Sequence, residues 1–201
     1  TSNGSLFGSS SGNILRLVDT DGDGQSDQTN TLVNNVPGGG LTSLRVAGDL
    51  VFTTGQGRGK PISIYRLATN PADPMSLVGS ININYPSGGW LHPHSALQVR
   101  EIDANTSELY FQLGSKVNFA TTSATAGLTS DVGLSGTLVG DAIHRVIITD
   151  DGTSVTASDL TQIATGLRNA AGMAFHPTTG DLYLEDNGID GLSNANEPHS
   201  A

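Results

Sequence analysis

The sequence predicts an all-β protein built from short antiparallel strands, and three observations support this prediction. Gly is frequent, with 26 of 201 residues, and only 14% of the residues are charged. Short apolar runs alternate with period two, are rich in β-branched and aromatic residues, and are separated by turns of Gly, Ser, Thr, Asn and Asp. One short strand signature returns along the chain. No amphipathic helix is predicted, and the length suits a single domain or part of a larger one.

The returning signature is Ile-x-Arg followed by Leu or Val. Its three copies are Ile14–Leu17, Ile64–Leu67 and Ile143–Val146. Each copy is followed by a polar turn that leads into another short apolar strand. A pattern of this kind indicates repeated units of supersecondary structure.

Hairpins are expected where an apolar run, a Gly, Asp or Asn turn and a Leu-led strand follow one another. The expected pairs are Leu44–Val46 with Leu50–Thr53, Leu97–Ile102 with Leu109–Gln112, and Met173–Phe175 with Leu182–Glu185. Four strands joined by tight turns form the blade of a β-propeller, which has about 40–45 residues in the simplest families.

We therefore expect a β-propeller segment of about three to four blades. It would hold the later strands of one blade, two whole blades and the first two strands of another, completed by further residues or by another chain. The Ser, Thr and Gly-rich stretch from Ser115 to Gly140 is expected to be an inserted loop over one face. The expected blade parts are 1–36, 37–86, 87–166 and 167–201.

The strongest local motif has the form D-x-D-x-D-G-x-x-D. Alternate carboxylates converge when such a loop curls around a hard cation, and the Gly permits the sharp turn. The twelfth position is Asn30 and the flanks are expected strands, so the loop is not an EF-hand; it resembles calcium hairpin loops of propellers such as integrin α-subunits. A polar turn without metal is the alternative. The expected structural Ca²⁺ ligands are Asp19, Asp21, Asp23 and Asp27 through their side chains and Gln25 through its carbonyl.

Charge and composition limit the partners and the compartment. The net charge is −10, from 19 acidic and 9 basic residues, which disfavours binding to nucleic acid and to anionic membranes. Cysteine is absent, so no disulfide or thiol-based metal site is expected. No apolar run is long enough for a membrane span and no signal segment opens the chain. Because such calcium sites suit millimolar calcium outside cells, we expect an extracellular or periplasmic protein whose signal has been removed.

The stretches Gly166–Pro177 and Gly180–Gly188 resemble the soluble glucose/sorbosone dehydrogenase family. Members are six-bladed propeller quinoproteins that use pyrroloquinoline quinone (PQQ) and Ca²⁺. The resemblance implies that Arg168 and Asn169 contact the PQQ. It also implies that the backbone carbonyls of Gly188 and Ile189 hold a catalytic Ca²⁺.

The family's general base is a His at the head of a blade. Here the resemblance favours His92 over His94, whereas the alternative makes both ordinary loop residues. The chain also departs from the family. Leu167 replaces a His that many members have, and Ala170 and Ala171 replace a Pro-Gln pair.

Three functions follow from these patterns. The leading one is oxidation of a hydroxyl of a sugar, an aldose or a similar molecule, with hydride transfer to PQQ. The alternative is a non-catalytic extracellular scaffold or binding module that assembles as a homo-oligomer through open strand edges. The third is a propeller lactonase with a central Ca²⁺, for which Glu185, Asp186 and Asn187 supply only one ligand cluster.

Overall fold

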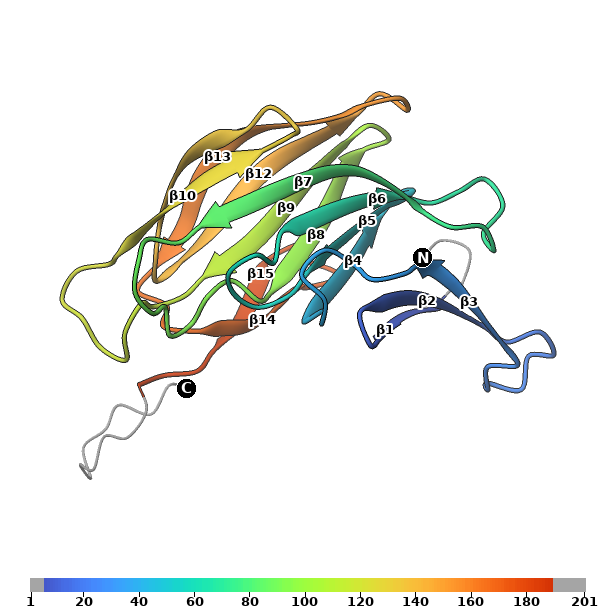
Figure 1. Cartoon of the computed structure of the whole chain (residues 1–201), viewed down its shortest axis with the longest axis horizontal. Helices are drawn as coiled ribbons and strands as arrows, with labels where there is room; N and C mark the ends of the chain where they lie inside the picture. Colours follow the sequence, from blue (N-terminus) through green and yellow to red (C-terminus); the bar gives the residue numbers. More distant parts are fainter. Residues whose placement is uncertain (1–5, 190–201) are drawn as a thin grey trace.

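The computed structural model describes residues 6–189, and within this range every regular element is a β-strand. Fifteen strands form four antiparallel sheets, and no helix is present (Figure 1). The predicted all-β class is therefore confirmed. Since the described residues contain no helix, none of them forms a helix that could cross a membrane. The first five and last twelve residues of the outermost expected blade parts lie outside the described range.

The sheets follow one another along the chain. The first sheet contains β1 (Leu6–Ser10), β2 (Asn13–Val18) and β3 (Gln28–Val33). The second contains β4 (Ser43–Ala47), β5 (Leu50–Thr54), β6 (Ile62–Arg66) and β7 (Ser76–Asn84), extended by β10 (Thr125–Ser130) and β11 (Ser135–Val139). The third contains β8 (Leu97–Asp103), β9 (Thr106–Leu113), β12 (Ala142–Asp150) and β13 (Val155–Thr165), and the fourth β14 (Ala170–Phe175) and β15 (Leu182–Asp186).

The three copies of the Ile-x-Arg signature occupy equivalent places in successive sheets. They lie in β2, β6 and β12, each of which is followed along the chain by the last strand of its meander. Each copy also has a shift in strand register directly after its Ile, at Ile14, Ile64 and Ile143. Because such a bulge re-aims the following side chains, its recurrence at one position shows that the sequence repeat is a structural repeat.

Three apolar clusters lie between successive sheets, because period-two alternation turns neighbouring side chains of a strand to opposite faces. In β5, Val51 packs with Ile14 of the first sheet, while Phe52 packs with Leu97 of the third sheet. In β9, Phe111 belongs to that same central cluster. Tyr110 of β9, Ile143 and Met173 form the cluster between the third and fourth sheets.

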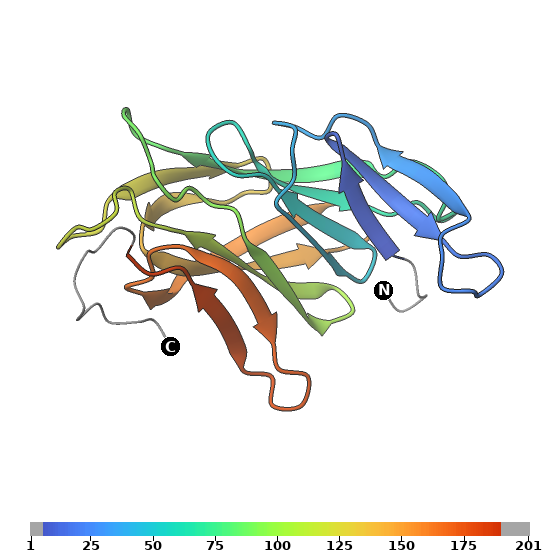
Figure 2. The same cartoon turned by 90° about the horizontal axis from the view of Figure 1, so that it is seen from below.

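The first strands of the second, third and fourth sheets are neighbours in space. β4 contacts β8, and β8 contacts β14. In Figure 2 the first sheet (blue) lies at one end beside β4 and β5, and the fourth sheet (red) lies beside β8. The first, third and fourth sheets have three, four and two strands, the numbers expected for them, whereas the second has six because β10 and β11 extend it. The three expected hairpins are β4–β5, β8–β9 and β14–β15. Within residues 6–189 no sheet closes on itself.

The inserted stretch 115–140 is not a single loop, so that expectation was wrong. It contains the hairpin β10–β11, and β10 pairs with β7 at the outer edge of the second sheet, with Leu128 opposite Ile83. Leu128 and Leu138 are fully buried, and Val132 in the connecting turn is nearly so. Alternating apolar residues therefore form strands here in spite of the Ser, Thr and Gly content.

Candidate calcium loop and candidate cofactor site

The acidic loop 19–27 joins β2 to β3, as the sequence predicts. Its base is closed by a hydrogen bond of 2.9 Å from the Asp27 backbone N–H to the Val18 carbonyl. Gly22 and Gly24 have φ angles of +79° and +87°. Since side chains disfavour this left-handed region, the two glycines allow the tight curl that turns the carboxylates inward.

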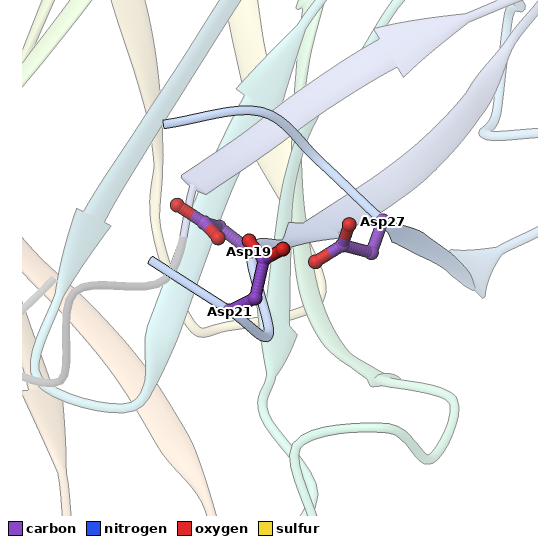
Figure 3. Close-up of side chains that lie close together, drawn as sticks. All are labelled: Asp19, Asp21 and Asp27. Carbon is purple, nitrogen blue, oxygen red and sulfur yellow. The ribbon is translucent and has the colours of Figure 1, made fainter. Parts of the chain in front are cut away.

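Three of the four predicted carboxylates come together. One oxygen from each of Asp19, Asp21 and Asp27 lies within 4.8 Å of the others, and all three residues are exposed (Figure 3). Ca–O bonds are about 2.3–2.6 Å long, so ligands on opposite sides of one ion are about 5 Å apart. The three oxygens are therefore close enough together to share one Ca²⁺.

The other two predicted ligands are engaged with each other. The Asp23 carboxylate accepts hydrogen bonds from the Gln25 backbone N–H at 2.7 Å and from its side-chain Nε2 at 3.1 Å. The structure therefore brings Asp23 into a local turn rather than into the carboxylate cluster. The orientation of the Gln25 carbonyl toward the cluster stays a prediction.

Hydrogen bonds fix two of the clustered carboxylates in place. Asp19 accepts from the N–H groups of Gly24 at 2.8 Å and Gly22 at 2.7 Å, and these bonds lower the pKa of Asp19. The Thr20 hydroxyl and N–H both donate to Asp27 at 2.7 Å and lower the pKa of Asp27. Both groups therefore stay charged at neutral pH, and their mutual repulsion favours a bound divalent cation.

The candidate catalytic and cofactor residues meet around one short piece of backbone, Gly114–Ser115. The His92 N–H donates to the Ser115 carbonyl at 2.9 Å, and the Ser115 N–H donates to the Arg168 carbonyl at 2.8 Å. A Cβ at Gly114 would lie 2.5 Å from the Arg168 oxygen and 2.8 Å from the His92 Cβ. Only glycine allows this approach, so Gly114 lets His92 and Arg168 lie side by side.

The Arg168 side chain is buried and is held by backbone carbonyls. Its Nη1 donates to the Gly188 carbonyl at 2.7 Å and to the Asn187 carbonyl at 3.3 Å. The Asp186 carboxylate accepts from the backbone N–H groups of Asn169 at 2.7 Å and Arg168 at 3.3 Å. These bonds tie the start of β14 to the end of β15.

A cavity of about 330 Å³ lies beside this junction. Ser115, Arg168 and Ile189 line it, together with residues of the segment 117–123. The Ser115 hydroxyl is buried and has no hydrogen-bond partner among the described residues. His92 is half-buried, and neither it nor Asn169 is among the residues that line the cavity.

His94 is a buried residue with a partner at each ring nitrogen, and the role of His92 as a base stays a prediction. It is 1% exposed, its Nδ1 is 2.5 Å from the Tyr85 hydroxyl and its Nε2 is 2.6 Å from the Lys60 carbonyl. The carbonyl can only accept, so Nε2 carries the proton and Nδ1 accepts from Tyr85. Burial lowers the pKa of His94 to about 4, so the ring is neutral at ordinary pH.

The residues at the junction fit the family's PQQ and calcium poorly. The Gly188 carbonyl, an expected calcium ligand, already accepts a hydrogen bond from a positively charged guanidinium. That guanidinium is the expected partner of a PQQ carboxylate, but two backbone carbonyls already engage its Nη1. We therefore assign no chemical step to either group here.

Sequence reasoning missed the residues that connect this site. Gly114 and Ser115 belong to no motif, although a glycine directly after the long strand β9 was a signal for a close backbone approach. Comparisons with protein-family models, curated proteins and solved structures find no match to this chain. The likeness of the stretch 166–188 to the sugar dehydrogenases therefore depends on its residues alone.

Proposed function

We propose that the chain is a calcium-stabilised segment of an extracellular β-propeller that acts as a binding or scaffold domain. The observation that carries this proposal is the convergence of Asp19, Asp21 and Asp27 in the loop between β2 and β3. Oxygen donors, an acidic loop and glycines at the turns are the features of a Ca²⁺ site.

The sheet arrangement supports the propeller part of the proposal. Successive sheets pack face to face through one apolar cluster each, and the first strands β4, β8 and β14 are neighbours. Propeller blades have the same order, with the first strand of each blade next to the central axis. On this proposal the sheets are consecutive blades of a ring.

The metal would have a structural role. All the clustered carboxylates come from one loop, and their neighbours donate backbone N–H groups to them. A bound ion would close the loop and so hold β2 against β3. Loops of this type with exposed ligands suit the high calcium concentration outside cells, which supports an extracellular or periplasmic location.

The test is a calcium titration by calorimetry on the wild-type chain and on the Asp21→Asn variant. The wild type should bind Ca²⁺ and gain thermal stability from it, whereas Asp21→Asn should lose most of both effects. Asp159→Asn is the matched control, because it removes one charge from β13, and Asn tolerates the φ of +53° found there. A wild type that shows no binding heat and no calcium-dependent shift in Tm would refute the proposed calcium site.

Sugar oxidation is the second candidate function, favoured by the meeting of His92 and Arg168 at Gly114–Ser115 beside the cavity. In it, the His92 ring would take a proton from a sugar hydroxyl. It ranks second because Arg168 is engaged by carbonyls. The test is dye reduction with aldoses after addition of PQQ and Ca²⁺. Turnover that His92→Gln abolishes would support oxidation, and no turnover would remove it.

A further inference from the structure

The Arg168 guanidinium lies on the Gly188 carbonyl oxygen, one of the two oxygens where the resemblance would place a calcium ion. Its Nη1 is 2.7 Å from the Gly188 carbonyl oxygen and 3.3 Å from that of Asn187. A guanidinium keeps its positive charge at any ordinary pH and can only donate hydrogen bonds. The Asn187 and Gly188 carbonyl oxygens, which follow β15, therefore already accept hydrogen bonds from a positive charge of the chain itself.

A calcium ion at the Gly188 oxygen would have this guanidinium as a neighbour in the observed arrangement. The oxygen has two lone pairs and one already accepts from Arg168, so calcium at about 2.3–2.6 Å could use only the other. Two positive charges would then lie on one oxygen in a partly buried site and would repel each other. Calcium would bind there without this repulsion only if the Arg168 side chain moved away.

The surroundings of Arg168 oppose such a movement. Its N–H is bonded to the Asp186 carboxylate, and its carbonyl accepts from the Ser115 N–H. The residue is 7% exposed, so release of the side chain would move a buried charge. The Arg168 backbone is therefore held through both its N–H and its carbonyl, which limits how far its side chain can move from the Gly188 carbonyl.

We propose that Arg168 is the resident cation of this site, in place of a metal ion, and that the chain takes up calcium at the 19–27 loop alone. The second half of this inference rests on the proposed calcium loop. A consequence concerns the cavity of about 330 Å³, which Arg168 and Ser115 help to line: a ligand in it would meet these residues rather than a divalent ion. The site would then act without calcium.

The first experiment counts bound calcium by calorimetry in the wild type and in an Asp19→Asn/Asp21→Asn loop variant, each with and without added PQQ. We expect one ion in the wild type and none in the loop variant under either condition. Trp90 is the chain's one Trp, and its indole N–H donates to the Gly114 carbonyl at 3.0 Å, so its fluorescence reports on the junction. Calcium should leave this emission unchanged.

The outcomes separate the two proposals. An ion that still binds to the loop variant and shifts the Trp90 emission would overturn the role given to Arg168. A wild type that binds no calcium would instead refute the calcium loop, while the absence of an ion at Gly188 would still support the resident cation.

The second experiment tests whether the charge of Arg168 matters. Arg168→Lys keeps the positive charge, whereas Arg168→Met removes it with an unbranched side chain close in length to that of Lys. If the guanidinium replaces a metal ion, Tm should fall less for the Lys variant than for the Met variant. Equal losses of Tm in both variants would show that only packing is needed, and this result would contradict the proposal.

Discussion

Lowering the pH should destabilise the fold through His94, a buried neutral histidine. Its ring lies against Tyr85, with 5.8 Å between ring centroids, and both ring nitrogens have partners. The Arg58 guanidinium lies over the other ring of this pair, 5.9 Å from the centroid of Tyr85. A second positive charge on His94 would therefore be buried near an existing one, with its Nδ1 hydrogen bond from Tyr85 lost.

The size of the effect follows from the pKa. Burial lowers the pKa of His94 from 6.5 to about 4 in the folded chain. The unfolded chain then binds the proton first, so the stabilisation is complete above pH 6.5 and is lost as the pH falls toward 4. One pKa unit corresponds to about 1.4 kcal/mol, so the loss is about 2 kcal/mol at pH 5 and about 3 kcal/mol at pH 4.

The assay is urea unfolding between pH 7.5 and pH 4, with the free energy of unfolding plotted against pH. His94→Gln should be less stable at pH 7.5 but should have a shallower slope between pH 6.5 and pH 4. Burial also lowers the pKa of His144, but His144 is present in both proteins. The difference between the two curves therefore isolates the contribution of His94. His176→Gln, at an exposed histidine, is the matched control. Equal slopes for wild type and His94→Gln would refute the reasoning.

Three further changes should have measurable effects. Gly114→Ala should cost about 1–3 kcal/mol in urea unfolding, because its Cβ would lie 2.5 Å from the Arg168 carbonyl oxygen, whereas Gly8→Ala meets nothing within 4 Å and should cost less. Phe52→Ala, at a fully buried ring in the central cluster, should cost about 3–5 kcal/mol, and a loss below 1 kcal/mol would contradict its place there. Calcium at about 100 times its Kd should stabilise the wild type by about 2.7 kcal/mol, and EDTA should reverse this shift but leave Asp21→Asn unchanged.

Local sequence patterns predicted the strands well. Period-two alternation located the three hairpins, and the Ile-x-Arg copies marked equivalent strands, because both signals depend on neighbouring residues alone. The 19–27 loop was predicted from spacing, and its turns do lie between two strands. Spacing could not show that Asp23 would bond to Gln25 rather than join the other carboxylates.

Long-range features were beyond the sequence patterns. The hairpin β10–β11 was mistaken for a loop because its partner strand β7 lies far earlier in the chain and its residues are mostly small and polar. The meeting of His92 with Arg168 depends on the one glycine at position 114 and on contacts between distant segments. Closure of the sheets into a ring stays a prediction, as does the likeness to sugar dehydrogenases.

The β10–β11 hairpin affects how the chain unfolds. By sequence it belongs between β9 and β12 of the third sheet, yet its hydrogen bonds join it to β7 of the second, and the Val132 carbonyl in its turn accepts from Ala157 in β13. The hairpin thus links the second sheet to the third through the chain and through this hydrogen bond, so the two sheets should melt as one cooperative unit. Among residues 6–189, no hairpin joins the first or the fourth sheet to its neighbour in this way, so the amides of these outer sheets should exchange hydrogen earlier.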